Sequence, residues 1–380
     1  MTAPAAAPPP EAGSAKPASR KSVEPQPSVA DGPPRIAARV LRRVWASYAF
    51  RRILQSVFVV WLVSTITFLL MHFMPGDPIE IMAGRLNSAG MSHEQAMATA
   101  SNIVNYDPDA GVWTQYLGFL KGLVTLDLGN SLTNPSKSVL DHVMEYLPWT
   151  LFAVGAGVVL ATVVGLSIGM AMAYRRGSAF DHVMTSIGSF LTGVPNYILI
   201  AAVVVIGFTV LGVLPFLDMR GRVSAGVEPG FNLVFFGDAL FHAFLPIIAF
   251  AFTATGSFML NMKAATTEVL TEDYVTVAQA RGLKPGRISR GYVGRNAMLP
   301  IIPQVALQMG TLVGGSIVIE QILDYPGAGQ MLMQAIGNRD YPVVQAAVIV
   351  LATSVVIASL IVDLVLVKID PRIKNQDQEA

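Results

Sequence analysis

The chain has 380 residues, of which 53% are hydrophobic and 13% are charged, and its formal net charge is +1. Soluble globular proteins carry roughly 25% charged residues, so this composition excludes an ordinary soluble protein and predicts a membrane protein. The near-zero charge gives no reason to expect a nucleic-acid partner. The absence of cysteine excludes disulfides, thiolate metal sites and a cysteine nucleophile. The histidines are scattered, so we predict no metal site at His72, His93, His142, His182 or His242.

The first 34 residues form an N-terminal extension that is rich in Ala, Pro and Ser and lacks apolar periodicity. Such a segment cannot bury enough surface to offset its ordering entropy, so residues 1–34 are expected to be disordered. No apolar core follows within about 30 residues, so a signal peptide is not expected. A basic juxtamembrane segment at 35–52 comes next, and a polar tail at 375–380 ends the chain.

Six apolar runs follow, each close to the roughly 20 residues that a helix needs to cross a bilayer. They lie near 53–74, 150–174, 183–214, 241–262, 298–322 and 343–367. The predicted fold is therefore all-α and polytopic, with transmembrane helix 1 at 53–74 and helices 2–6 within 148–374. Pro195 predicts a kink in the third run.

Glycines in the second apolar run have the spacing of a helix-contact motif. Gly165 and Gly169 are separated by three residues, and Gly155 and Gly157 precede them. Small residues at this spacing favour close contact with another helix, although glycine is also tolerated without such contact in membrane helices. Both interpretations remain open at this point.

Lysine and arginine are distributed unequally between the segments that join the apolar runs. Most lie in segments that are cytoplasmic if the N-terminus is cytoplasmic, so the positive-inside rule places both termini there. The segment 75–147 is then external. It opens with a helix stop, Pro-Gly-Asp-Pro at 75–78, and contains an amphipathic stretch at 112–123. Because long connections usually have structure of their own, we predict a small external domain.

The segment 264–300 is a polar and basic cytoplasmic loop between the fourth and fifth apolar runs. Thr271 is expected to cap a short helix. Gly282 is placed for a left-handed helix stop, with Leu283 as its apolar contact and Pro285 preventing continuation. These signals predict two short helices around a Gly-Leu-Lys-Pro corner.

One face of the first short helix is a candidate surface for another protein. It carries residues at helical spacing: Tyr274, Val277, Ala278 and Arg281. The small Ala278 allows a second surface to approach closely. The alternative is a basic amphipathic loop that lies on anionic lipid. The Gly-Leu corner and the alanine on this face favour protein docking.

The sequences YVTVAQARGL and RNAMLPI in this loop resemble the EAA-type cytosolic loop of ABC-importer permeases. Thr276, Val277 and Ala278 stand where that family has Glu-Ala-Ala, and Leu260 stands where it usually has arginine. Further segments resemble, in order, the B-type permease of the peptide/nickel (Dpp/Opp) branch. They are MPGDP at 74–78, DLGNS at 127–131, GVPNY at 193–197, DYPGAG at 324–329, RDYPVVQ at 339–345 and VDLVLVKIDPRI at 362–373.

The resemblance implies a type I ABC-importer permease in the bacterial plasma membrane that carries peptides or related small solutes. No G-x-x-x-x-G-K-[ST] phosphate loop is present, so ATP and Mg belong to partner subunits, and no cofactor or enzymatic activity is expected in this chain. The implied partners are a homologous C-type permease, two ATP-binding subunits or one fused ATPase, an external solute-binding protein and membrane lipid. Coupling to the ATPase is assigned by resemblance to Tyr274, Val277, Ala278, Arg281, Gly282 and Leu283.

Polar residues on otherwise apolar helices are candidates for lining the translocation path. They are Ser64, Thr67, Asn196, Tyr197, Thr253, Gln304, Gln308 and Glu320. Acids inside membrane segments are functional hypotheses by default. Glu320 is a candidate contact for the binding protein or a substrate amine, whereas Asp363 is expected to form a structural ion pair with Lys368.

Two other classes of protein deserve comparison. An ion-coupled secondary transporter is expected to have acids near mid-membrane and broken helices in matched halves. Here the acids lie toward the ends of the runs, and no inverted repeat is visible. An intramembrane enzyme needs a Ser/His or paired-Asp constellation, and no Gly-x-Ser-x-Gly elbow accompanies the histidines. The importer permease is therefore the favoured function.

Overall fold

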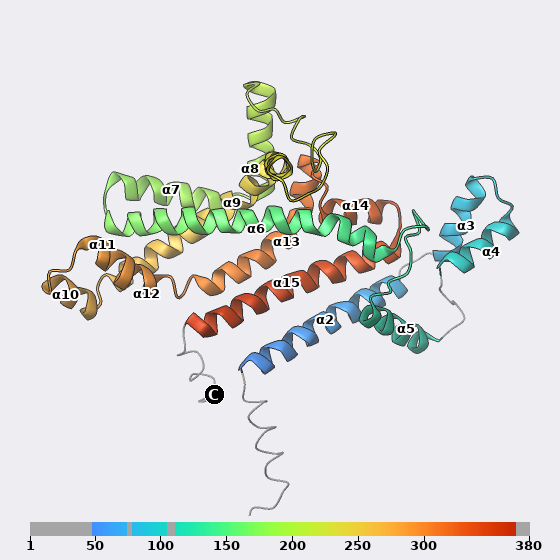
Figure 1. Ribbon diagram of the computed structural model, residues 1–380, viewed down its shortest axis with the longest axis horizontal. Helices are drawn as coiled ribbons and strands as arrows, with labels where there is room; N and C mark the ends of the chain where they lie inside the picture. Colours follow the sequence, from blue (N-terminus) through green and yellow to red (C-terminus); the bar gives the residue numbers. More distant parts are fainter. Residues whose placement is uncertain (1–47, 74–77, 105–110, 370–380) are drawn as a thin grey trace, which may run out of the picture. The chain divides into compact units, whose positions relative to one another are not determined.

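The computed structural model describes residues 48–73, 78–104 and 111–369, and the regular elements within these ranges are helices (Figure 1). The N-terminal extension 1–34, most of the basic segment that follows it and the tail at 375–380 lie outside the described residues. The predictions of disorder and of cytoplasmic termini for these segments therefore stay predictions.

Within the described part of the chain, five helices are long and apolar enough to cross a membrane. They are α2 (Tyr48–His72), α6 (Val139–Tyr174), α9 (Leu233–Val269), α13 (Ile302–Leu323) and α15 (Tyr341–Ile369). A sixth span results if one bent pair is counted, in which α7 (Ala179–Gly193) is followed by α8 (Asn196–Val204) and the π-helical η1 (Val205–Val210). The all-helical polytopic fold is therefore confirmed.

Two spans are longer than their apolar runs predict. α6 begins at Val139 instead of residue 150, and α9 spans Leu233–Val269 instead of 241–262. The added turns contain charged residues such as Asp141, which a hydropathy criterion excludes from a span. Helix propagation costs little once a helix exists, so the backbone continues through these polar ends.

The predicted kink at Pro195 is a full break. The axes of the two helices that flank it differ by 102°. Val194 has an extended backbone with φ −101° and ψ 127°. This conformation is the one that a residue before proline prefers, and Pro195 has no N–H to continue the α7 ladder.

Glycines bring α6 and α9 into close contact along their length (Figure 1). A Cβ atom added at Gly157 would lie 2.7 Å from Cβ of Phe250, and one at Gly165 would lie 2.8 Å from Cβ of Phe258. Later residues of α6 meet later residues of α9, so the two helices are parallel. The helix-contact interpretation of the glycine spacing is confirmed for these positions, whereas Gly155 has no neighbour within 4 Å.

The long connection after α2 contains helices of its own, α3 (Pro78–Ser88), α4 (His93–Val104) and α5 (Val112–Thr125). α3 and α4 pack around a small apolar core of Ile79, Met82, Ala83, Ala96 and Ala100. α5 matches the amphipathic stretch predicted at 112–123. The other short elements are α10 (Asp273–Ala280), α11 (Pro285–Arg287), the π-helical η2 (Ile288–Gly294), α12 (Arg295–Ala297) and α14 (Ala328–Gly337).

Candidate functional site

The segment 271–300, called the elbow below, has an apolar core of its own next to the end of α9. Val275 and Val293 are fully buried, and Ala278 and Ile288 are 3% and 6% exposed. Partly buried residues complete this core: Val269, Leu270, Leu283 and Tyr292. The elbow is therefore a folded unit and not an extended polar loop.

The first helix of the elbow ends in a Schellman motif. The N–H of Leu283 donates to the carbonyl of Ala278 (3.3 Å), and the N–H of Gly282 donates to that of Gln279 (2.9 Å). Gly282 has φ +71°, in the left-handed region that favours glycine. The predicted helix stop is confirmed.

The predicted helix cap at Thr271 is wrong. α10 begins at Asp273, and its N-cap residue Glu272 makes no side-chain capping bond. The Thr271 hydroxyl instead donates to the carbonyl of Glu268 (2.7 Å), at the end of α9. Thr271 therefore serves the preceding helix, because α10 starts one residue later than a Thr271 cap requires.

Substitutions at Gly282 should separate backbone strain from loss of contact. Valine should destabilise the elbow by about 1–2 kcal/mol, because β-branched residues disfavour positive φ. Asparagine should cost less, since it tolerates this conformation. A Cβ atom at Gly282 has no neighbour within 4 Å, so a steric clash does not complicate the comparison. The measurement is the rate of limited proteolysis within the elbow. Equal rates for the valine and asparagine variants would contradict the prediction.

The exposed face of α10 differs from the predicted docking face at one residue. Tyr274 and Val277 are 39% and 54% exposed, and Arg281 is exposed. Ala278 lies instead on the buried side of the helix with Val275. The prediction that Ala278 meets a partner is therefore wrong, and Ala278→Asp would disturb the elbow's core. The available face consists of Tyr274, Val277 and Arg281.

The Tyr274 side chain is also held from within the elbow. The Asn296 side chain, whose Nδ2 donates to the carbonyl of Tyr292 (2.7 Å), acts on the Tyr274 hydroxyl. Burial and the nearby Glu272 carboxylate raise the pKa of Tyr274, and Asn296 lowers it by less. The phenol is therefore neutral at physiological pH.

The elbow contacts α6 as well as continuing from α9. The Ser289 hydroxyl lies 3.5 Å from Sδ of Met170. A Cβ atom added at Gly294 would lie 3.0 Å from Cε of the same methionine. The elbow is thus joined to α9 through the chain and to the end of α6 through packing.

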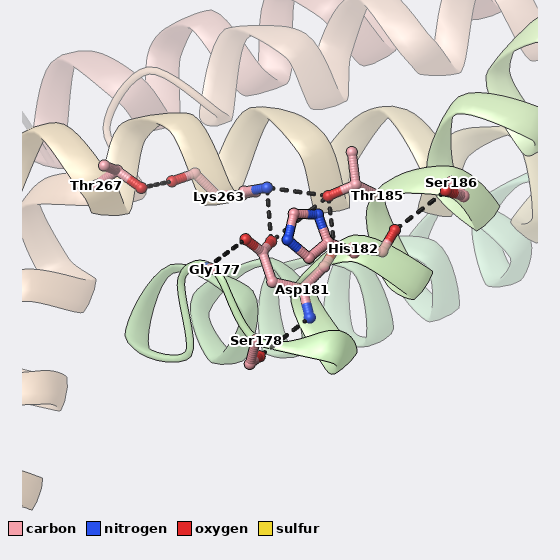
Figure 2. A network of polar contacts seen from close by, with 8 residues as sticks. All are labelled: Gly177, Ser178, Asp181, His182, Thr185, Ser186, Lys263 and Thr267. Atoms are coloured by element: carbon pink, nitrogen blue, oxygen red, sulfur yellow. Dashed lines mark hydrogen bonds and ion pairs between the residues drawn. The ribbon is translucent and has the colours of Figure 1, made fainter.

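An ion pair fixes the start of α7 to α9 (Figure 2). Asp181, only 4% exposed, lies 2.6 Å from Nζ of Lys263, which also donates to the Thr185 hydroxyl (2.9 Å). The second carboxylate oxygen accepts from the N–H of Gly177 (3.0 Å), and Asp181 N–H donates to Ser178 Oγ (3.3 Å). Sequence reasoning missed this site, although Ser-x-x-Asp is a helix-capping pattern.

The candidate path residues of α2 and of the α7–α8 break lie apart from one another. Ser64 and Thr67 are buried, and their hydroxyls donate to carbonyls in their own helix (both 2.7 Å). Asn196 Oδ1 accepts from the N–H of Tyr197 (2.9 Å), whose side chain is 42% exposed. Their role in a path stays a prediction.

One of the candidate path residues on α9 and α13, Gln304, forms a hydrogen bond between these two helices. Asn261 of α9, which sequence reasoning missed, donates to Oε1 of Gln304 (2.7 Å). Gln308 lies one turn further along α13 and is half-buried. The Thr253 hydroxyl is buried, with no hydrogen-bond partner within the described ranges. Gln304 thus joins polar groups of two spans, α9 and α13.

Glu320 is a structural residue, which contradicts its assignment to the path. It is 1% exposed, and its Oε2 accepts from the N–H groups of Gly329 (2.7 Å) and Gln330 (3.0 Å) in the first turn of α14. Its Oε1 accepts from the Thr150 hydroxyl (2.6 Å). The carboxylate satisfies N–H groups at the positive end of α14 and is inaccessible to substrate.

The glycines of the segment DYPGAG leave room for close contact with α13, which carries this carboxylate. A Cβ atom at Gly327 would collide with the Glu320 carboxylate, and one at Gly329 would lie 2.7 Å from Cα of Ile317. α13 and α14 therefore approach each other too closely for larger residues.

Asp340 joins two of the segments that carry the family resemblance. It is 2% exposed and accepts from the Ser131 hydroxyl (2.5 Å) and from the N–H groups of Leu132 (3.1 Å) and Thr133 (2.9 Å). The segment before α6 is thus fixed to the start of α15. Arg85 of α3 donates to the carbonyl of Leu132 as well (3.0 Å).

Asp363 forms an ion pair between two spans. Its Oδ2 lies 2.7 Å from Nε of Arg52 in α2. The side chain of Lys368, the predicted partner, lies outside the described residues. Asp363 thus forms a structural ion pair, but its partner is Arg52, which is distant in the sequence and was not predicted.

Comparisons with known proteins place the chain in a family. Residues 165–375 match the family described as "Binding-protein-dependent transport system inner membrane component", and residues 46–153 match the N-terminal region of such components. The chain therefore belongs to this family of transport-system membrane components. The resemblance to permeases of the peptide branch is confirmed.

Named relatives cover most of the chain. The dipeptide transport system permease protein DppB of Escherichia coli K12 is 34% identical over 333 residues, covering 83% of this chain and 94% of that protein. The di/tripeptide permease protein DppB of Pseudomonas aeruginosa is 32% identical, with the same coverage. The oligopeptide permease protein AppB of Bacillus subtilis is 28% identical, covering 87% and 99%. A solved structure of the MetNI methionine ABC transporter, inward facing, has TM-score 0.46 and 17% identity, covering 60% of this chain and 96% of that one.

Proposed function

We propose that this chain is the membrane-spanning permease subunit of an ATP-driven importer and that it forms the translocation path with a second, homologous permease. Membership of a binding-protein-dependent transport family supports delivery of cargo by an external solute-binding protein. The relatives named for dipeptide, di/tripeptide and oligopeptide transport support short peptides as the cargo class. An ion-coupled transporter is not favoured, because buried Glu320 and Asp340 serve structural hydrogen bonds.

The observation that carries this proposal is the exposed face of α10 on a separately folded elbow. A helix that has its own core can present Tyr274, Val277 and Arg281 without depending on the partner for its shape. Exposed aromatic and arginine side chains beside an aliphatic residue are typical of protein interfaces. We assign this face to docking of an ATP-binding subunit, which supplies the nucleotide and Mg.

We assign the elbow to the cytoplasm. The elbow is basic because it contains Lys284, Arg287, Arg290 and Arg295. The positive-inside rule assigns such loops to the cytoplasmic side. Both chain termini are assigned to the same side. The helices α3, α4 and α5 then lie outside, where the binding protein docks.

The contacts of the elbow support a route for motion from the ATPase to the membrane. The elbow continues from α9, contacts α6 at Met170 and lies beyond the Lys263–Asp181 pair that holds α7. A displacement of α10 would therefore reach three spans. ATP binding would bias a two-state arrangement through these contacts.

Val277→Glu should abolish docking of the ATPase without unfolding the permease. Val277 is 54% exposed, so the free chain tolerates glutamate, whereas a buried interface would have to accommodate an unpaired charge. Loss of an interface anchor of this kind costs roughly 3 kcal/mol, or about a hundredfold in affinity. The measurement is recovery of ATPase with the purified permease, together with cargo-stimulated ATP hydrolysis.

The matched control is Gln279→Glu. Gln279 is exposed on the same helix, but it lines a groove with Tyr174 and Pro285 on the side facing the end of α6. This variant adds the same charge and should keep the ATPase. Equal retention of the ATPase by both variants would remove α10 as the docking helix.

A further inference from the structure

Helix α5 packs onto α2 with one side only. Phe68 of α2 lies 5.3 Å from the ring of Tyr116 and 5.4 Å from the ring of Phe119, measured between centroids. The Tyr116 and Thr65 hydroxyls are 2.8 Å apart and form a hydrogen bond. These contacts fix α5 near the C-terminal end of a membrane span.

Beside this contact, α5 carries large apolar residues that nothing in the described part of the chain covers. Trp113, Leu117 and Val124 are 77%, 62% and 85% exposed, and helical spacing places them on one line, called the α5 stripe below. Polar residues occupy another side of the helix: Thr114, Lys121 and Thr125. α5 therefore has an apolar stripe and a polar side, both exposed.

The surface of α2 next to α5 indicates which environment the α5 stripe contacts. Leu69, in the part of α2 that contacts α5, is 40% exposed, and Phe73, directly after α2, is 77% exposed. α2 is apolar enough to span a bilayer and packs on α15 as its neighbouring span (Figure 1). A spanning helix exposes its apolar side chains to lipid wherever no protein covers them, and α5 contacts the end of this span.

We propose that α5 is an interfacial membrane helix whose stripe contacts lipid acyl chains beside α2. Amphipathic helices lie in the plane of the interface with apolar residues toward the acyl chains and polar residues toward water. Trp113 has the amphipathic indole that is enriched at this depth. The ammonium group of Lys121 reaches the headgroups from the polar side. The segment between α2 and α6 is thus anchored to the bilayer at a second place, independent of the spans.

Site-directed spin labelling tests this arrangement directly, because the chain contains no cysteine and needs no background substitutions. Single-cysteine variants Leu117→Cys and Val124→Cys report on the stripe. Thr114→Cys and Lys121→Cys are matched controls on the polar side of the same helix. Each is labelled with a nitroxide in the assembled importer in lipid bilayers, and the unsubstituted complex provides the background from other subunits.

The expected result is a reversal of accessibility around the helix. Labels on the stripe should collide readily with oxygen, which partitions into lipid, and rarely with a water-soluble nickel chelate, and control labels should do the opposite. High nickel accessibility at the stripe would place it in water and overturn the proposal. Low accessibility to both reagents would mean that a protein subunit covers the stripe, which overturns it as well.

Discussion

Replacing Gly169 with valine should destabilise the permease by about 3 kcal/mol, at the upper end of the usual cost of overpacking. A Cβ atom at this position would collide with the carbonyl oxygen of Met259 and would lie 2.8 Å from Cβ of Met262. Backbone atoms cannot move aside as a flexible side chain can, so α6 and α9 would have to separate. The measurement is thermal unfolding of the purified chain in detergent.

Gly155→Val is the control for this prediction. It lies on the same helix, has no neighbour within 4 Å and undergoes the same chemical change. We expect it to unfold at the temperature of the unsubstituted protein, or slightly above, because glycine is a poor helix former. An equal loss of stability at both positions would show that glycine matters for the helix itself and not for the α6–α9 contact.

Glu320→Leu should be the other strongly destabilising change, with a loss of roughly 3 kcal/mol. Leucine fills a similar space, but it leaves the N–H groups of Gly329 and Gln330 buried without an acceptor, and each such loss costs about 1–3 kcal/mol. The Thr150 hydroxyl also loses its partner. Thermal unfolding and amide exchange in α14 are the measurements.

The conservative change Glu320→Gln distinguishes a structural role from a substrate contact. Glutamine keeps one acceptor oxygen, so it should retain part of the stability and the same apparent affinity for cargo at low concentration. Reduced affinity with unchanged thermal stability would assign the carboxylate to cargo instead of α14.

Signals confined to one segment predicted much of this fold. The length of the apolar runs indicated six spans, Pro195 marked the break, and Gly282 with Leu283 marked the end of α10. The apolar runs depend on the hydrophobicity of their side chains, and the proline and glycine signals depend on backbone properties of those residues. The positions of these features could therefore be predicted without knowing the tertiary contacts.

Contacts between distant segments could not be predicted in the same way. Asp363 was paired with Lys368 because the two are near in sequence, yet packing of α2 on α15 brings Arg52 to it. Glu320 was assigned to the path because a buried acid is costly, but its partners lie on α6 and α14. Helical spacing shows which residues share one face of a helix, but it does not show which face is buried. Ala278 was therefore predicted on the exposed face of α10, whereas it lies in the core of the elbow.

The close packing of α6 against α9 has a mechanical consequence. Two helices whose backbones touch at successive glycines resist bending and sliding more than either helix alone. The pair therefore forms a stiff lever arm, attached at one end to the elbow by both of its helices. The helix break at Pro195 interrupts the backbone hydrogen bonds between α7 and α8, so a rotation of the lever would change the angle between these two helices more easily than it would bend either of them.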